Sequence, residues 1–151
     1  MRVRAAVFAL CALGLGGCTT VPTPVAAPTQ TFGPWTVSQC TISTRAADVW
    51  LTTTGSLTFG GELEFQAQFT PPLVRPPFAT ISGRPIPVRT EGANRTYNLF
   101  LPYTPETGAH FLQTGSFITL TYQPLGRMEL QDVSFPTAPL MQALSAIAGC
   151  P

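Results

Sequence analysis

The sequence contains no lysine and little charge of either sign. Its basic residues are 8 arginines, its acidic residues number 7, and charged residues make up only 10% of the chain. A surface that binds nucleic acid or anionic lipid needs clustered cationic side chains, and no such cluster occurs here. The composition therefore argues against a nucleic-acid-binding protein.

The sequence also lacks the short motifs that mark common catalytic and cofactor sites. It has no glycine-rich phosphate loop, no metal-ligand motif and no Gly-x-Ser-x-Gly elbow. No second histidine or spaced cysteine set accompanies its one histidine, His110, which disfavours a metal site. We predict no cofactor, no metal and no enzymatic activity.

The apolar run near the N-terminus is too short to cross a membrane as a helix. It covers residues 5–17, follows Arg2 and Arg4, and falls well below the ~20 residues that a spanning helix needs. This layout is typical of a signal peptide that is removed from the mature protein.

The signal ends in Leu15-Gly16-Gly17-Cys18, which resembles the lipobox of bacterial lipoproteins. The resemblance implies cleavage before Cys18, lipid on Cys18 and a domain outside the cytoplasm. Thr19 stands where an aspartate would imply retention in the inner membrane. The resemblance therefore implies an outer-membrane anchor, with the domain facing the periplasm or the cell surface. The alternative is an ordinary secretory signal cut near Gly17, with Cys18 a chance cysteine.

The rest of the chain divides into a tether and one domain, which gives three parts: 1–17, 18–31 and 32–151. The tether is rich in proline and threonine and has no charge and no apolar periodicity. In an extended polyproline-like form its 13 residues after Cys18 would reach about 40 Å. That length would hold the domain clear of the lipid headgroups.

The domain has the composition of a mainly β protein, because threonine and proline are abundant and charge is scarce. We predict an antiparallel β-sandwich or partly open barrel with one short C-terminal α-helix. The clearest strand is 62–69, where apolar and polar residues alternate. Other expected strands are 35–42, 49–54, 56–59, 80–82, 86–90, 95–101, 117–122 and 128–135. The helix is expected after Thr137 as N-cap and ends at Gly149.

Two cysteines remain in the domain once Cys11 leaves with the signal and Cys18 carries lipid. An even pair in an oxidising compartment predicts a disulfide between Cys40 and Cys150. The alternative, a catalytic thiol, would need a nearby base, and His110 is the only histidine.

The two ends of the domain resemble a known family. Trp35-x-x-x-x-Cys40, together with Leu140-x-x-Ala143-Leu144 before Cys150, is similar to small periplasmic proteins of the invasion-associated locus B type. The resemblance implies a β-sandwich closed by its C-terminal segment and a non-enzymatic role in the envelope.

The proline-rich segment 71–78 is the candidate contact site for a partner. Its prolines cannot donate ladder hydrogen bonds, so it is expected to be an extended surface loop. Such a loop would present Leu73, Val74 and Phe78 to a partner. Alternatively, it only joins two strands and guards a sheet edge.

Three functions are compatible with these features. The first is a non-catalytic outer-envelope module that is anchored in the membrane by lipid and binds an envelope protein or polymer. The second is a lipid-anchored hydrolase, which would use His110 with Ser116 or Glu62 with Glu64. The paired glutamates are better explained as the solvent face of an antiparallel strand. The third is a small β-barrel that carries an apolar ligand, suggested by ten phenylalanines and a positive mean hydropathy.

Overall fold

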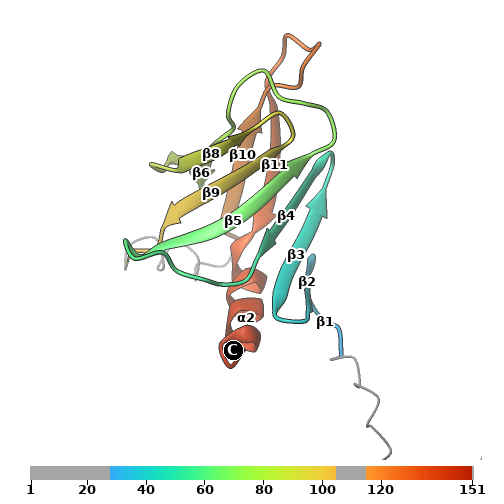
Figure 1. The fold of residues 1–151 in the computed structure, drawn as a ribbon. Coiled ribbons are helices and arrows are strands. Elements are labelled where there is room, and N and C mark those ends of the chain that lie inside the picture. The colour runs from blue at the N-terminus through green and yellow to red at the C-terminus, as the bar shows by residue number, and fades with distance from the viewer. Residues whose placement is uncertain (1–27, 105–114, 151) are drawn as a thin grey trace, which may run out of the picture.

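The computed structural model describes residues 28–104 and 115–150, which form two antiparallel sheets and one helix (Figure 1). In spatial order, the seven-stranded sheet comprises β1 (Gln30–Phe32), β2 (Trp35–Ser38), β3 (Thr41–Ala46), β4 (Val49–Thr53), β5 (Glu62–Phe69), β9 (Thr96–Pro102) and β8 (Arg89–Ala93). The four-stranded sheet comprises β11 (Gln131–Pro136), β10 (Phe117–Tyr122), β6 (Phe78–Ile81) and β7 (Arg84–Pro85), and the helix is α2 (Thr137–Ile147). The predicted mainly β fold with a short C-terminal helix is confirmed.

The core lies between the two sheets and follows the alternation of the strands. On β5, Leu63, Phe65, Ala67 and Phe69 are all buried, while Gln66 and Gln68 are exposed. The apolar residues of β10 meet them from the smaller sheet, where the ring of Tyr122 packs at a tilt on that of Phe69, with 5.0 Å between the ring centres. The predicted two-sided character of β5 is therefore confirmed.

Helix α2 closes the end of the sandwich next to β1 and β2. It contacts both strands and buries Leu140, Ala143 and Ile147. Trp35 on β2 is fully buried beside it, where its indole N–H donates to the carbonyl of Pro136 at 2.9 Å. The Trp35 ring also packs on Phe135 at 6.1 Å. These contacts join the start of the domain to its end.

The single strand predicted at 35–42 is wrong, because the chain reverses within it. β2 and β3 form a two-residue hairpin at Gln39 and Cys40, with φ angles of 48° and 62°. The left-handed region is uncommon for residues other than glycine, asparagine and aspartate, so Gln-Cys gives no turn signal in sequence.

The predicted helix cap and the start of the last strand also differ from the structure. Pro136 is the N-cap of α2, with no side-chain capping bond. Thr137 is fully buried, and its hydroxyl donates to the carbonyl of Ser116 at 3.0 Å, so tertiary contact replaces capping. The last strand begins at Gln131, and Met128 is exposed in the preceding turn.

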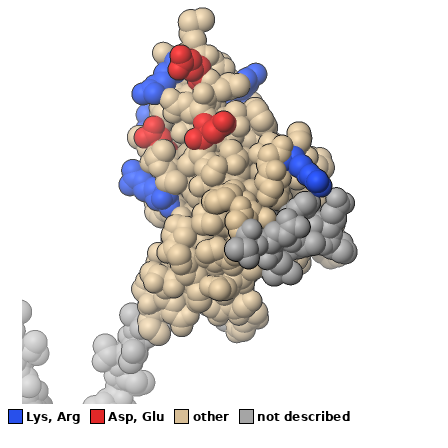
Figure 2. Space-filling view, turned by 180° about the vertical axis from the view of Figure 1, so that it is seen from behind, with Lys and Arg blue, Asp and Glu red and all other residues tan. Residues whose placement is uncertain are grey.

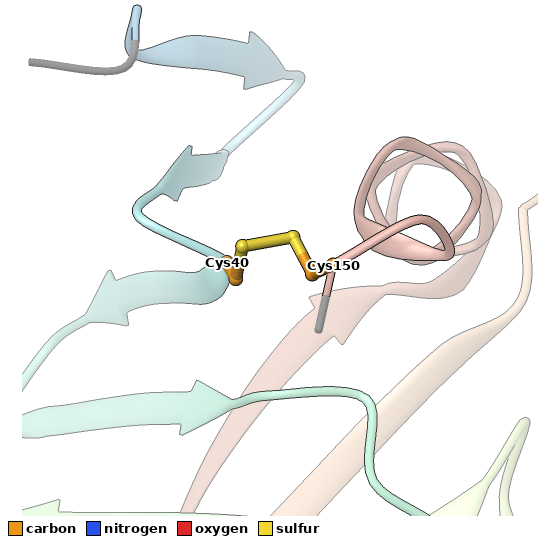
Figure 3. Close-up of a disulfide and its surroundings, with 2 residues drawn as sticks. All are labelled: Cys40 and Cys150. Atoms are coloured by element: carbon orange, nitrogen blue, oxygen red, sulfur yellow. A yellow bond between two sulfur atoms is a disulfide. The ribbon is translucent and has the colours of Figure 1, made fainter. Parts of the chain in front are cut away.

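The predicted disulfide is confirmed. Cys40 in the β2–β3 turn is bonded to Cys150 just after α2, with 5.9 Å between their Cα atoms (Figure 3). The bond fixes the helix to the hairpin on which it packs and closes a loop of 110 residues.

Replacing both cysteines, Cys40→Ser with Cys150→Ser, should lower the free energy of unfolding. The chain-entropy model gives about 4 to 5 kcal/mol for a loop of this length. Urea unfolding monitored by tryptophan fluorescence would measure the loss. Each single variant is the control and should lose about as much as the double variant, because either one breaks the same bond. An unchanged unfolding midpoint would contradict the structural role of the bond.

Candidate functional site: the outer face of the seven-stranded sheet

The outer face of the seven-stranded sheet carries a row of uncharged polar side chains. In the register of β3, β4, β5 and β9, Ser43 lies opposite Thr52, Thr52 opposite Gln66 and Gln66 opposite Asn98. Directly opposite residues of antiparallel strands share a face, so the row runs across the sheet. Within residues 28–104 and 115–150, none of these four side chains hydrogen-bonds to another residue.

A second row contains an exposed tryptophan. Trp50 on β4 lies between Arg45 on β3 and Gln68 on β5, and Gln68 in turn lies opposite Thr96. Trp50 is 49% exposed, whereas Trp35, on the inner face, is fully buried. Gln66 and Gln68, two residues apart on β5, bring the two rows to within about 7 Å of each other.

Two hollows in the surface lie along these two rows of side chains. One has a volume of about 380 Å3 and is lined by Arg45, Asp48, Trp50, Gln68, Phe69, Thr70, Arg95 and Thr96. The other has a volume of about 280 Å3 and is lined by Thr41, Thr52, Thr53, Thr54, Glu64, Gln66 and Asn98. Both open on the same face, so an elongated ligand can contact them together.

A charged cluster borders this face on β5 and β8. Arg89 forms ion pairs with Glu62, at 3.0 Å, and with Glu91. Its guanidinium also lies 3.7 Å from the centre of the Phe100 ring, which it covers. Phe100 is consequently only 7% exposed although it belongs to the outer face.

The ion pair sets the protonation of Glu62. The hydrogen bond from Arg89 lowers the pKa of Glu62 below its ordinary value, and the same bond raises the pKa of Arg89. A carboxylate held ionised in this way is poorly suited to act as a general acid. The pair Glu62 and Glu64 therefore resembles a solvated strand face more than an acid/base pair.

A cleft larger than these two hollows lies beside α2. It has a volume of about 690 Å3 and is bounded by α2, the Cys40–Cys150 disulfide, the β4–β5 connection and Tyr103. Gly55 is required in that connection, because a Cβ there would lie 2.9 Å from Cδ1 of Ile147 and its φ is +72°. This cleft lies at the end of the sandwich, while the space between the sheets is occupied by buried side chains.

The structure divides the predicted contact residues between core and surface. Leu73 is only 8% exposed and belongs to the core, so its predicted exposure is wrong. The reason is that segment 71–74 hydrogen-bonds to the end of β10: the amide of Val74 donates to the carbonyl of Gln123 at 2.9 Å. Val74 and Phe78 are exposed, and their contact with a partner stays a prediction.

The remaining predicted residues fall into two groups. Ser116 is buried, and its carbonyl accepts the bonds from Thr137. His110 and Cys18 lie outside the described residues, so their predicted roles stay predictions.

Sequence analysis missed Trp50, Arg45 and Arg95 as site residues. Val49 and Leu51 are buried, so strict alternation places Trp50 between them on the polar face. A tryptophan at a solvent-facing position of a strand was therefore the feature of the sequence that could have indicated this site. Arg95 gave none, because its place depends on the β8–β9 turn.

In the described part of the chain, no three or more His, Cys, Asp and Glu side chains gather in a way that would hold a metal ion. None of the helices among those residues has the length and apolar character needed to cross a bilayer.

Comparison with protein-family models, with curated proteins and with solved structures found no match for this chain.

The pKa of Glu62 should depend on Arg89. In the folded protein, carboxyl NMR titration should find this pKa below its ordinary value, and Arg89→Gln should raise it. Arg84→Gln, on β7 of the other sheet, is the control and should leave it unchanged. Because the folded pKa is lowered, the stability from this pair is present above the unfolded pKa and is lost as pH falls through the folded pKa. A Glu62 pKa that is the same in the wild type and in Arg89→Gln would contradict the assignment of this ion pair.

Proposed function

We propose that this protein is a lipid-anchored module of the outer bacterial envelope that binds a polysaccharide of the envelope and catalyses no reaction. The observation that carries the proposal is the outer face of the seven-stranded sheet. There, hydroxyl and amide side chains that bond to no other residue in the described part of the chain surround the half-exposed Trp50.

The chemistry of this face suits a sugar polymer. Amide and hydroxyl groups both donate and accept hydrogen bonds, which is what sugar hydroxyls require. The face of an indole ring carries negative charge density and attracts the weakly positive C–H bonds of a sugar ring. The row from Arg45 to Thr96 crosses four strands, a span of about 14 Å at 4.7–4.9 Å per strand.

The position of this face relative to the tether also supports the proposal. Gln30 on β1 lies opposite Val37, near the end of the sheet that holds Cys40 and α2. The β3–β4 turn lies at the other end (Figure 1), and Trp50 follows directly after this turn in the register of the two strands. A chain anchored through Cys18 would thus approach the membrane with its α2 end and present Trp50 away from the lipid.

The distribution of charge agrees with that orientation. In Figure 2, which views the molecule from behind, charged side chains lie over the upper part and none is visible at the lower end. That end contains α2, in which no residue of Thr137–Ile147 is charged. An uncharged end is the one that can approach a membrane surface at least electrostatic cost.

The absence of catalysis is proposed from the groups that a hydrolase would use. Glu62 is held by Arg89, and Ser116 is buried and lines none of the three hollows described above. Acyl and glycosyl transfer each need at least two convergent groups with tuned protonation.

Trp50→Ala should weaken binding to an envelope polysaccharide at least about tenfold, the effect of losing ~1.4 kcal/mol at a central aromatic contact. Affinity electrophoresis of the full-length protein through galactan, mannan and β-glucan gels, with cosedimentation on murein sacculi, would measure this. Phe78→Ala is the matched comparison, because Phe78 is 48% exposed but lies on the other sheet.

The two variants separate two binding sites. Loss of binding with Trp50→Ala alone supports the polysaccharide face. Loss with Phe78→Ala alone would overturn it in favour of a contact site at segment 71–78. Unchanged thermal unfolding of both variants would show that neither loss reflects misfolding.

Cys18→Ala should release the protein from membranes, because lipid on Cys18 is the proposed anchor. Fractionation of cells labelled with radioactive palmitate would follow both the label and the protein. A wild-type protein without label, or a variant that stays with the membrane fraction, would contradict the anchor.

A further inference from the structure

The hollow beside Trp50 carries more positive than negative charge. Its charged lining residues are Arg45, Arg95 and Asp48, which sum to +1. This differs from the neighbouring row of uncharged side chains, which contains Ser43, Thr52, Gln66 and Asn98. It also differs from the chain as a whole, whose part after residue 17 has six arginines against seven acidic residues.

The two arginines of this hollow are available to a ligand. Among the described residues neither Arg45 nor Arg95 forms an ion pair, whereas Arg89 is held by two carboxylates. Asp48 lines the same hollow without pairing with either arginine. The hollow therefore holds two cationic groups that form no ion pair with any carboxylate of residues 28–104 and 115–150.

The backbone holds these groups in place. Arg45 lies directly opposite Trp50 in the β3–β4 pair. Arg95 belongs to the β8–β9 turn, and its carbonyl accepts a hydrogen bond of 2.7 Å from the amide of Phe69, which fixes the turn against β5. The backbone that carries these two arginine side chains is thus held in place by hydrogen bonds of the sheet.

This combination of groups matches one kind of sugar. A guanidinium group recognises carboxylate and phosphate oxygens with two parallel hydrogen bonds. The Trp50 ring provides the surface for a sugar ring, and Gln68 and Thr96 provide contacts for its hydroxyls. Asp48 accepts hydrogen bonds from hydroxyls and limits the net charge that the hollow can attract.

We propose that this hollow is the subsite for an acidic sugar, that is, a sugar ring carrying a carboxylate or a phosphate. The inference rests on the proposed polysaccharide-binding function and adds the charge of the unit bound beside Trp50. A small anion alone would not use the tryptophan, and a net charge of +1 is too small for a nucleic acid backbone.

Matched polymers test the charge directly. Affinity electrophoresis of the full-length protein would compare polygalacturonate with the same polymer fully methyl-esterified, and phosphomannan with mannan. We expect the acidic polymer of at least one pair to bind about tenfold more tightly than its neutral counterpart. Binding only to polygalacturonate identifies a carboxylate, and binding only to phosphomannan identifies a phosphate.

Arginine variants test which residues recognise the acidic group of the polymer. Arg45→Gln and Arg95→Gln should each reduce binding of the acidic polymer towards the level of the neutral one. Arg84→Gln, an exposed arginine on β7, should have no effect. Arg45→Lys keeps the charge but loses the paired hydrogen bonds, and we expect binding intermediate between wild type and Arg45→Gln. Thermal unfolding of each variant checks that it is folded.

The possible failures are distinct. Equal binding of acidic and neutral polymers, with no effect of either arginine variant, would overturn the acidic-sugar subsite. Binding of a neutral polymer that still depends on Trp50 would then leave the proposed function standing. Failure of the wild-type protein to bind any of these polymers or murein would contradict both proposals.

Discussion

The packing of α2 against the β2–β3 hairpin is the contact on which the rest of the structure depends. Trp35 buries its ring beneath the helix, and the Cys40–Cys150 bond fixes the helix end to the hairpin turn. The helix packs on the inner side of the sheet, where it contacts β1 and β2. One side of the seven-stranded sheet is thereby buried by α2 and the smaller sheet, and the other is left for solvent or a ligand.

The outer side of that sheet presents polar side chains to solvent in a fixed arrangement. Its strands are fixed in register by their neighbours, so polar side chains stand in rows at the spacing of the strands. Groups placed on rigid strands lose little conformational entropy when they bind. This makes the face of Trp50 and Gln66 a stronger candidate for polymer binding than the cleft beside α2, whose lining includes the buried core residues Leu63 and Ile147.

The sequence predicted those parts of the fold in which one residue pattern decides the structure. The alternation of 62–69 predicted β5, residues 117–122 were also predicted as a strand, and cysteine counting predicted the disulfide. It failed where tertiary contact overrides local preference: Gln39 adopts a positive φ, and Leu73 is drawn into the core by pairing with the end of β10. The site was missed because its residues come from separate strands, and only the sheet register brings Arg45, Trp50 and Gln68 together.

The most direct test is an NMR titration of the isotope-labelled full-length protein with trigalacturonate. We expect shifts of the Trp50 indole N–H and of the side-chain amides of Gln66, Gln68 and Asn98, because these groups lie on the outer face itself. Resonances of β6 and β10 on the opposite sheet should stay unchanged. Shifts confined to β6 and β10, or to residues around the cleft beside α2, would contradict the assignment of the binding face.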